Sequence, residues 1–216
     1  MTNSLTSCAA ITTATRSTSS CPTGAHTGRP EVVGRSATSS QQQVQHGVFV
    51  NIGGVGTLIT GTAGIGKSEI ALELISRGYT LIGDDAPLFS VSDTGQVIGT
   101  CPGLLDGFLE IRDLGILDIR ALFGNQAVTG PQQLDLIVEL IAEKTTAPTP
   151  EEKLAGCQFQ KIVCKTSIPG ISIATGSFRN LAVLVETAAR NHLLKIKGYN
   201  PASEFQSRLN SRLAKS

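Results

Sequence analysis

The sequence predicts one α/β domain built around a mixed β-sheet, and three observations lead to this prediction. Short apolar runs typical of strands are interspersed with stretches that have helical periodicity. Two early strand-like runs are separated by Gly53-Gly54, a pair that favours a tight antiparallel hairpin. The second run leads into a glycine-rich loop and then a helix, an order typical of α/β proteins.

The size and composition of the chain fit a single globular domain and exclude several classes of protein. Its 216 residues are 40% hydrophobic, which is enough to bury a core. A formal net charge of +1 gives no electrostatic basis for binding nucleic acid or a membrane surface. Aromatic residues are only 4%, and no apolar run reaches the roughly 18 residues of a membrane helix. Five widely spaced cysteines without a C-x-x-C motif indicate reduced thiols and a cytoplasmic location.

Residues 1–45 differ in composition from the rest of the chain. Seventeen of them are Ser or Thr, and their apolar residues follow no period. Such a segment buries too little surface to offset its ordering entropy, so a disordered tail is expected, followed by a domain at 46–216. A Ser-rich, acid-poor transit peptide is the alternative. Pro22 and Pro30 interrupt the segment, which favours the tail.

The first half of the domain is expected to alternate between strands and one helix. The helix covers Glu69–Gly78, because Ile70 and Leu74 share a face and Gly78 is a natural stop. A loop-rich stretch is predicted at 101–124. The strands of this half are expected at 48–52, 55–60, 79–83, 88–91 and 97–98.

The second half is expected to end in two helices. A central strand is predicted at 134–141, and strand-like pieces near 162–163 and 171–173. Residues 144–153 are polar with two prolines and are predicted to form an exposed loop. An apolar stripe predicts a helix over 180–197, and Asn200-Pro201 predicts the start of a last amphipathic helix.

The glycine-rich loop matches the pattern G-x-x-x-x-G-K-[ST] in full, between a predicted strand and a predicted helix. Its backbone N–H groups are expected to bind nucleotide phosphates, Lys67 to contact the β- and γ-phosphates, and Ser68 to bind Mg²⁺. A glycine-rich turn with a solvated lysine is the alternative, which the strand and helix on either side disfavour. The residues of this predicted ATP site are Gly61, Thr62, Ala63, Gly64, Ile65, Gly66, Lys67 and Ser68.

Two carboxylates and a histidine complete the set of candidate residues. Asp84-Asp85 follows the strand after the phosphate loop, and neighbouring strand residues point to opposite faces. One carboxylate of the pair can therefore hold the metal while the other acts as a base. A turn or a helix cap is the alternative use of this pair. His46 begins the hairpin that leads into the loop, which can bring it near the transferred phosphate.

Taken together, His46-Gly47-Val48, the phosphate loop, Asp84-Asp85 and residues 109–124 resemble the catalytic domain of HPr kinase/phosphorylase. Enzymes of this bacterial family phosphorylate a serine of the phosphocarrier protein HPr with ATP. They also remove that phosphate with inorganic phosphate, releasing pyrophosphate. The resemblance implies a P-loop-containing mixed-sheet kinase domain similar to phosphoenolpyruvate carboxykinase, and a homohexamer. Its signature region comprises Leu109, Glu110, Ile111, Arg112, Asp113, Leu114 and Gly115.

The resemblance also implies roles for individual residues. It gives His46 a place near the transferred phosphate and Lys67 a catalytic role. It makes Asp85 the residue that transfers the serine proton in both directions, which leaves Asp84 to help hold the metal. Glu110 becomes a second metal ligand beside Ser68, although a surface ion pair between Glu110 and Arg112 is the alternative. The loop that serves the reverse reaction corresponds to Ala174, Thr175, Gly176, Ser177, Phe178 and Arg179.

Departures from the family pattern bear mainly on the reverse reaction. The family's separate N-terminal domain is replaced by residues 1–45, and Lys153 stands where the family has a catalytic arginine. Lysine keeps the charge but not the planar fork of arginine. Phe178 and Asp113 stand where glycine is usual. Two alternatives therefore stay open: a nucleotide-binding regulatory module with weakened catalysis, and a P-loop kinase with a different acceptor.

Overall fold

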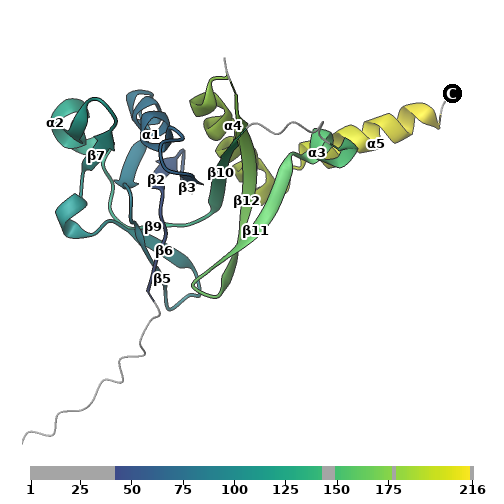
Figure 1. Cartoon of the computed structure of the whole chain (residues 1–216). Helices are drawn as coiled ribbons and strands as arrows, with labels where there is room; N and C mark the ends of the chain where they lie inside the picture. The colour runs from purple at the N-terminus through teal and green to yellow at the C-terminus, as the bar shows by residue number, and fades with distance from the viewer. Residues whose placement is uncertain (1–41, 143–148, 177–178, 215–216) are drawn as a thin grey trace, which may run out of the picture. The chain divides into compact units, whose positions relative to one another are not determined.

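The computed structural model describes residues 42–142, 149–176 and 179–214, all within one compact unit, Thr38–Ser216. Three layers build this unit: helices, a six-stranded mixed sheet and a four-stranded antiparallel sheet (Figure 1). The strands are β1 (Gln43–Val44), β2 (Val48–Ile52), β3 (Val55–Gly61), β4 (Thr80–Gly83), β5 (Leu88–Val91), β6 (Val97–Thr100), β7 (Phe108–Ile111), β8 (Gly115–Asp118), β9 (Gln132–Gln133), β10 (Leu136–Ala142), β11 (Cys157–Val163) and β12 (Thr166–Thr175). The α-helices are α1 (Lys67–Ser76), α2 (Ile119–Phe123), α3 (Pro150–Ala155), α4 (Leu181–Ile196) and α5 (Pro201–Leu213), with 3₁₀ turns at Gly103–Leu105 and Asn125–Ala127.

The central sheet has the strand order β11-β12-β10-β3-β2-β4 and carries the site at one edge. Strands β3, β10 and β12 run parallel, so their carboxyl ends meet at the same edge. The predicted Gly53-Gly54 hairpin is present, since β2 pairs antiparallel with β3. The prediction of a mixed-sheet α/β domain is therefore confirmed.

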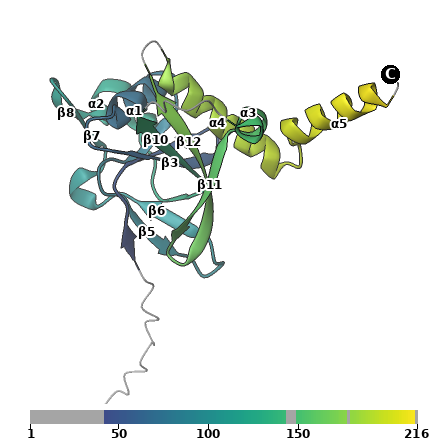
Figure 2. The ribbon, with the colours of Figure 1, turned by 45° about the vertical axis from the view of Figure 1, so that its right-hand side comes forward.

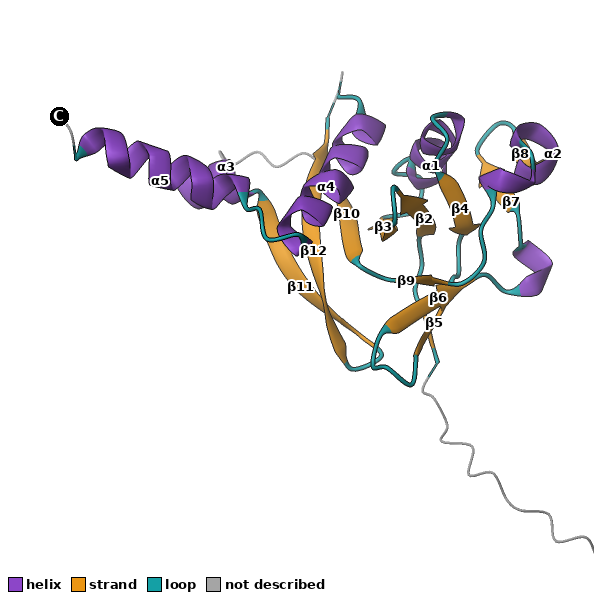
Figure 3. Ribbon diagram, turned by 180° about the vertical axis from the view of Figure 1, so that it is seen from behind, coloured by secondary structure: helices purple, strands orange, loops and turns teal. Residues whose placement is uncertain are grey.

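Two hydrophobic cores lie on opposite faces of this sheet, because successive strand residues point to opposite sides. Val48, Val50 and Ile52 of β2 pack beneath α1 and α4, whereas Phe49 faces the four-stranded sheet. There its ring meets that of Phe89 edge-on at a centroid distance of 5.3 Å. Figures 1 and 3 show α1 and α4 on one side of the central strands and β5, β6 on the other.

Two stretches that were predicted to be loops contain regular structure. Residues 101–124 include the β7–β8 hairpin and α2, whose first turn is capped by the Asp118 carboxylate. Residues 150–155 form α3. Thr149 and Glu152 make a capping box at its start, and Pro150 occupies the first helical position. The high density of polar residues and turn formers concealed both elements.

The amino-terminal boundary of the domain also needs a correction. Residues 42–45, which the composition assigns to the tail, include β1, and Gln43 and Val44 of this strand pair with Phe89 and Leu88 of β5. The side chain of Gln43 further accepts a hydrogen bond from the N–H of Cys164 at 2.8 Å. The predicted disorder of residues 1–41 lies outside the described residues.

Candidate active site

The phosphate loop joins the end of β3 to the start of α1, as the sequence predicts. Gly64 and Gly66 have φ of 74° and 96°, values that glycine adopts without strain. The Lys67 ammonium donates to the carbonyl oxygens of Gly61 and Thr62 at 3.2 and 3.1 Å, which holds it at the rim of the loop. The backbone N–H groups at the start of α1 and this ammonium together provide a positively charged phosphate-binding site.

Asp84 lies at the centre of the site, where β4 ends. Its carboxylate is buried and accepts hydrogen bonds from the N–H groups of Asp85 and Glu110 at 2.9 and 3.0 Å. The Ser68 hydroxyl lies 3.5 Å from the same carboxylate. Burial raises the pKa of Asp84 above its ordinary value, against the lowering effect of the two N–H donors. Asp84 therefore connects the phosphate loop to β7, where Glu110 lies.

Asp85 has an environment unlike that of its neighbour. It is exposed, and its φ of 62° lies in the left-handed region, which Asp tolerates better than most residues. Its carbonyl oxygen accepts from the N–H of Gly47 at 3.1 Å, so the chain at His46 runs directly beside it. A Cβ at Gly47 would lie 2.4 Å from the carbonyl oxygen of Ile59, which explains why glycine follows His46.

The β7–β8 hairpin brings the signature region next to the phosphate loop. Glu110 and Arg112 are both exposed, and among the described residues no ion pair joins them, so the ion-pair alternative is wrong. A Cβ at Gly64 would lie 2.5 Å from Nη2 of Arg112, so the guanidinium lies directly against the loop. The sequence assigned no chemical role to Arg112, because its position depends on a hairpin that was not predicted.

The loop assigned to the reverse reaction begins at the carboxyl end of β12. Thr175 still pairs with Ala142, and Nη1 of Arg179 donates to the carbonyl oxygen of Ala174 at 2.8 Å. Asn180 caps α4 by accepting from the N–H of Val183, and its amide donates to Glu73 of α1 at 3.2 Å. This hydrogen bond ties the end of the loop to the phosphate-loop helix. Ser177 and Phe178 lie outside the described residues.

A charged cluster reinforces the contact between α1 and α4 farther from the loop. Arg77, which follows α1, pairs with Glu73 and with Glu186 of α4. Glu186 also accepts from the hydroxyl of Tyr79 at 2.8 Å, and these donors lower its pKa. The two helices that border the site are thus held together by side chains as well as by the core.

Lys153 is the candidate that the structure does not bring to the phosphate loop within one chain. It is exposed on α3, which packs beside β11. Strands β12 and β10 separate β11 from β3, a distance of three strand spacings, or about 14 Å. Figure 2 also shows α3 and α1 at different ends of the domain.

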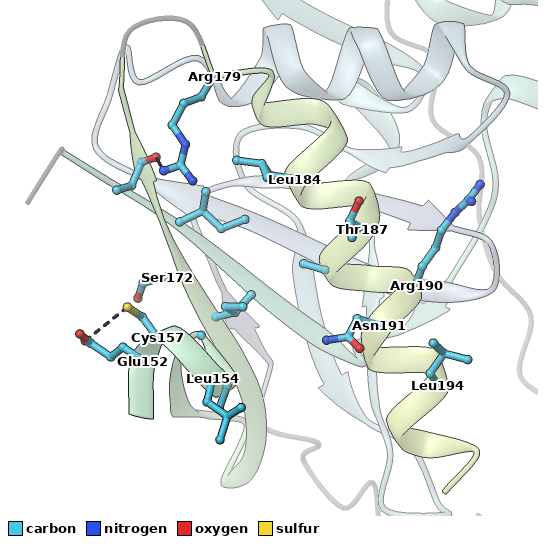
Figure 4. A pocket seen from close by; sticks show the side chains of 16 residues that line it. Glu152, Leu154, Cys157, Ser172, Arg179, Leu184, Thr187, Arg190, Asn191 and Leu194 are labelled. Carbon is cyan, nitrogen blue, oxygen red and sulfur yellow. Dashed lines mark hydrogen bonds between the residues drawn. The ribbon is translucent and has the colours of Figure 1, made fainter. Parts of the chain in front are cut away.

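A cavity of about 780 Å³ lies between α4 and the β11–β12 hairpin, on the side of α3. In Figure 4, Leu184 and Asn191 point from α4 toward the hairpin, and Arg179 lies at one end of the cavity. The cavity does not include the phosphate loop, so it is separate from the proposed site of phosphate binding.

The described part of the chain has neither a membrane-spanning helix nor a cluster of metal-binding side chains. Across residues 42–142, 149–176 and 179–214, no helix is long and apolar enough to cross a membrane. In the same ranges, no group of three or more His, Cys, Asp or Glu side chains is arranged to hold a metal ion.

Comparisons with known proteins identify relatives over most of the chain. The family described as HPr Serine kinase C-terminal domain matches residues 37–209. An HPr kinase/phosphorylase of Stenotrophomonas maltophilia (strain K279a) is 46% identical over 173 residues, which are 79% of this chain and 54% of that protein. One from Xanthomonas campestris pv. campestris (strain B100) is 47% identical over 165 residues, 76% of this chain and 52% of that protein. The chain thus spans about half the length of these curated relatives.

A solved structure agrees with the sequence comparisons. The Hpr(Ser) kinase/phosphatase from Coxiella burnetii superimposes with a TM-score of 0.69 and is 36% identical. The match covers 76% of this chain and 98% of that chain.

Proposed function

The chain belongs to the HPr Serine kinase C-terminal domain family, and from this premise we propose that it transfers the γ-phosphoryl group of ATP to a serine of HPr. One observation carries the proposal: the phosphate loop, a buried carboxylate and an exposed carboxylate converge at one edge of the central sheet. Phosphoryl transfer needs phosphate binding, charge neutralisation and a base, and this edge offers a residue for each.

The oxygen ligands at this edge fit Mg²⁺. The Ser68 hydroxyl lies 3.5 Å from the Asp84 carboxylate, which accepts from the backbone N–H of Glu110. These three residues are the proposed source of hydroxyl and carboxylate oxygens, the ligands that Mg²⁺ prefers together with water and phosphate oxygens. Bound Mg²⁺ would supply charge neutralisation on the phosphates. Lys67 adds a second positive charge, and its present hydrogen bonds to two loop carbonyls keep it within the loop.

Asp85 is the proposed base. It accepts the proton of the serine hydroxyl as the serine oxygen bonds to the γ-phosphorus and the bond to the leaving ADP oxygen breaks. Exposure on the protein surface suits this role, because the acceptor is a residue of another protein. His46 lies in the segment that contacts Asp85 and is proposed to face the transferred phosphate.

The reverse reaction belongs to the proposal as well. An oxygen of inorganic phosphate would attack the phosphorus of phosphoserine and the bond from that phosphorus to the serine oxygen would break. Asp85 would give its proton to the serine oxygen, and the pyrophosphate formed would be released. Residues 174–179 are the proposed loop for this direction, and the hydrogen bond from Asn180 to Glu73 supports their position beside α1. A homohexamer and a cytoplasmic location are further proposals, the first resting on the family resemblance and the second on the wide cysteine spacing without a C-x-x-C motif.

The test is transfer of labelled phosphate from ATP to purified HPr, with an HPr whose acceptor serine is alanine as the control. Label on HPr and none on the alanine variant is the expected result. Label on a different protein would favour another acceptor. ATP binding without transfer to any protein would favour the regulatory module. Phosphorylated HPr incubated with inorganic phosphate should release pyrophosphate, which tests the reverse direction separately.

A further inference from the structure

The cavity between α4 and the β11–β12 hairpin has apolar walls and no part in the proposed transfer reaction. Helix α4 contributes Leu184, Ala188 and Leu194 to it, and the hairpin contributes Ile171 and Ile173. Leu184 and Leu194 both line it, so it extends about 15 Å along the helix at the 1.5 Å rise of each residue. Its volume of about 780 Å³ lies within the range of small-molecule sites. The walls therefore suit the apolar body of a small molecule.

A positive charge lies at one end of this cavity. Figure 4 shows Arg179 there, and Nη1 of its guanidinium donates to the carbonyl oxygen of Ala174 at 2.8 Å. No carboxylate in the described part of the chain pairs with Arg179, whereas Arg190 at the rim pairs with Glu186. Its remaining N–H donors can therefore bind an anionic group that enters the cavity.

The opposite end of the cavity disfavours a second anion. The carboxylate of Glu152 lies there (Figure 4) and accepts hydrogen bonds from the N–H of Thr149 and the thiol of Cys157. Between the two ends, Asn191 turns its half-buried amide toward the hairpin, and no side-chain hydrogen bond joins that amide to another described residue. The cavity thus offers a cation at one end, apolar walls with one amide along its length, and a negative charge at the other end.

We propose that this cavity is a binding site for a small molecule that has one anionic group, bound by Arg179, and an apolar body held between α4 and the β11–β12 hairpin. A carboxylate on an alkyl chain or an aromatic ring has this chemistry. The planar fork of the guanidinium can engage both carboxylate oxygens, and the walls remove the apolar body from water.

Binding at this cavity reaches the loop proposed for the reverse reaction, a consequence that rests on the proposed function. Arg179 ends that loop, and the next residue, Asn180, donates to Glu73 of the phosphate-loop helix at 3.2 Å. A ligand that occupies the guanidinium competes with inorganic phosphate for the charge of the loop. Occupation of the cavity should therefore slow the reverse reaction more than the forward reaction.

The test uses octanoate as the charged probe and 1-octanol as its neutral counterpart. Each is titrated into the full chain with labelled leucine and isoleucine methyl groups and followed by NMR. Octanoate should shift the methyl signals of Leu184 and Ile173 but not that of Ile116 in β8, outside the cavity. Its dissociation constant should be on the order of 1 mM, and 1-octanol should bind about tenfold more weakly.

Three variants locate the probe. Arg179→Gln should weaken octanoate binding about tenfold and change the affinity for 1-octanol by less than about threefold, because only the charged contact is lost. Ala188→Phe fills the cavity and should abolish binding of both probes. Val183→Phe, on the exposed face of the same helix, is the matched control and should bind both as the wild type does. Melting temperatures show whether each variant folds, and the wild-type methyl shifts test the site without any variant.

The last measurement concerns the reverse reaction. Octanoate at five times its dissociation constant should lower pyrophosphate release from phosphorylated HPr at least threefold in the wild type, and should leave Ala188→Phe unaffected. Absence of methyl shifts at the cavity, equal affinity for the two probes, or binding that disappears as the chain self-associates would overturn the inference, the last by assigning the cavity to a second copy. Failure of the wild type to phosphorylate HPr would instead overturn the proposed function, and the NMR titrations would still test the cavity.

Discussion

The candidate site has two halves, and they are assembled in different ways. The phosphate-loop half consists of residues 61–68, Asp84-Asp85, Glu110 and His46; hydrogen bonds centred on Asp84 connect its loop, carboxylates and hairpin. The β12 half consists of residues 174–180 and Lys153. Its link to the phosphate-loop helix through described side chains is the hydrogen bond from Asn180 to Glu73.

The difference between the halves follows from their places in the sheet. The phosphate-loop half is built on β3 and β4 with β2 between them, so its residues meet across adjacent strands. On the other side of β3, β12 lies two strands away, as β4 does, and Lys153 lies beside β11, one strand or about 4.8 Å farther. The residues proposed for transfer from ATP therefore lie close together, whereas Lys153 lies one strand beyond the loop proposed for the reverse reaction.

The largest expected effect tests whether the phosphate-loop half carries the chemistry. Lys67→Ala should lower transfer to HPr by at least a hundredfold, because it removes positive charge from the developing transition state. The fold should be unchanged, since the hydrogen bonds of the Lys67 ammonium within the described part of the chain go to two loop carbonyls. Transfer rates and circular dichroism decide, and activity equal to the wild type would contradict the phosphate-loop assignment.

The next effect separates the two adjacent carboxylates. Asp85→Asn should lower the rate more than Asp84→Asn does, because an amide cannot accept the serine proton. The free energy of unfolding should instead fall more for Asp84→Asn than for Asp85→Asn. Asn at position 84 keeps one acceptor for two N–H donors, which costs about 1–3 kcal/mol, whereas Asn at 85 tolerates the left-handed backbone. Initial rates and melting temperatures of both variants test this, and a greater rate loss for Asp84→Asn would reverse the assignment.

These two predictions use residues that the sequence made recognisable, and the reason is local. The phosphate loop and Asp84-Asp85 each lie in a short stretch whose residue types and spacing indicate their chemistry. The strand-like runs on either side of Gly53-Gly54 likewise predicted the β2–β3 hairpin.

The features that the sequence did not predict depend on contacts between distant segments or on weak patterns. The position of Arg112 requires the β7–β8 hairpin, whose strands are four residues each and largely exposed on one side. The bond from Asn180 to Glu73 joins residues 107 apart in the chain. Strand β1 has two residues, too few for any periodicity to indicate it.

A smaller effect tests the bond that holds the two halves together. Asn180→Asp keeps the capping oxygen of α4 but places a carboxylate against Glu73, so the loop and α1 should separate. We expect the reverse reaction to fall roughly three- to tenfold more than the forward reaction, a difference of about 1 kcal/mol. Asn180→Ala is the matched variant. It removes the α4 cap as well as the hydrogen bond to Glu73, so it should also lower the melting temperature. Equal losses in both directions for Asn180→Asp would show that the bond does not distinguish the halves.

An effect on thermal stability defines the residue at which the folded domain begins. A chain that starts at Gln42 should have the same melting temperature as the full chain, because residues 1–41 show no periodic apolar face. A chain that starts at His46 loses β1 and the Gln43 bond to Cys164, and should melt a few degrees lower, for a loss of roughly 1–2 kcal/mol. Thermal unfolding of the three chains measures both differences. A lower melting temperature for the chain starting at Gln42 would assign structure to the preceding residues.

The smallest effect concerns Lys153, where the family resemblance and the structure lead to opposite expectations. If Lys153 acts on phosphate in the catalytic position, Lys153→Arg should raise the reverse rate roughly tenfold to a hundredfold, since a bidentate contact adds about 1–3 kcal/mol. The structure puts Lys153 on an exposed face of α3 at the far edge of the sheet, beyond the small extra reach of arginine. We therefore expect both rates to stay within twofold of the wild type, as they should for Lys161→Arg on β11, the matched control. Rates at saturating ATP and at saturating phosphate decide, and a rise confined to Lys153→Arg would mean that α3 meets a phosphate site by a contact absent from the single chain.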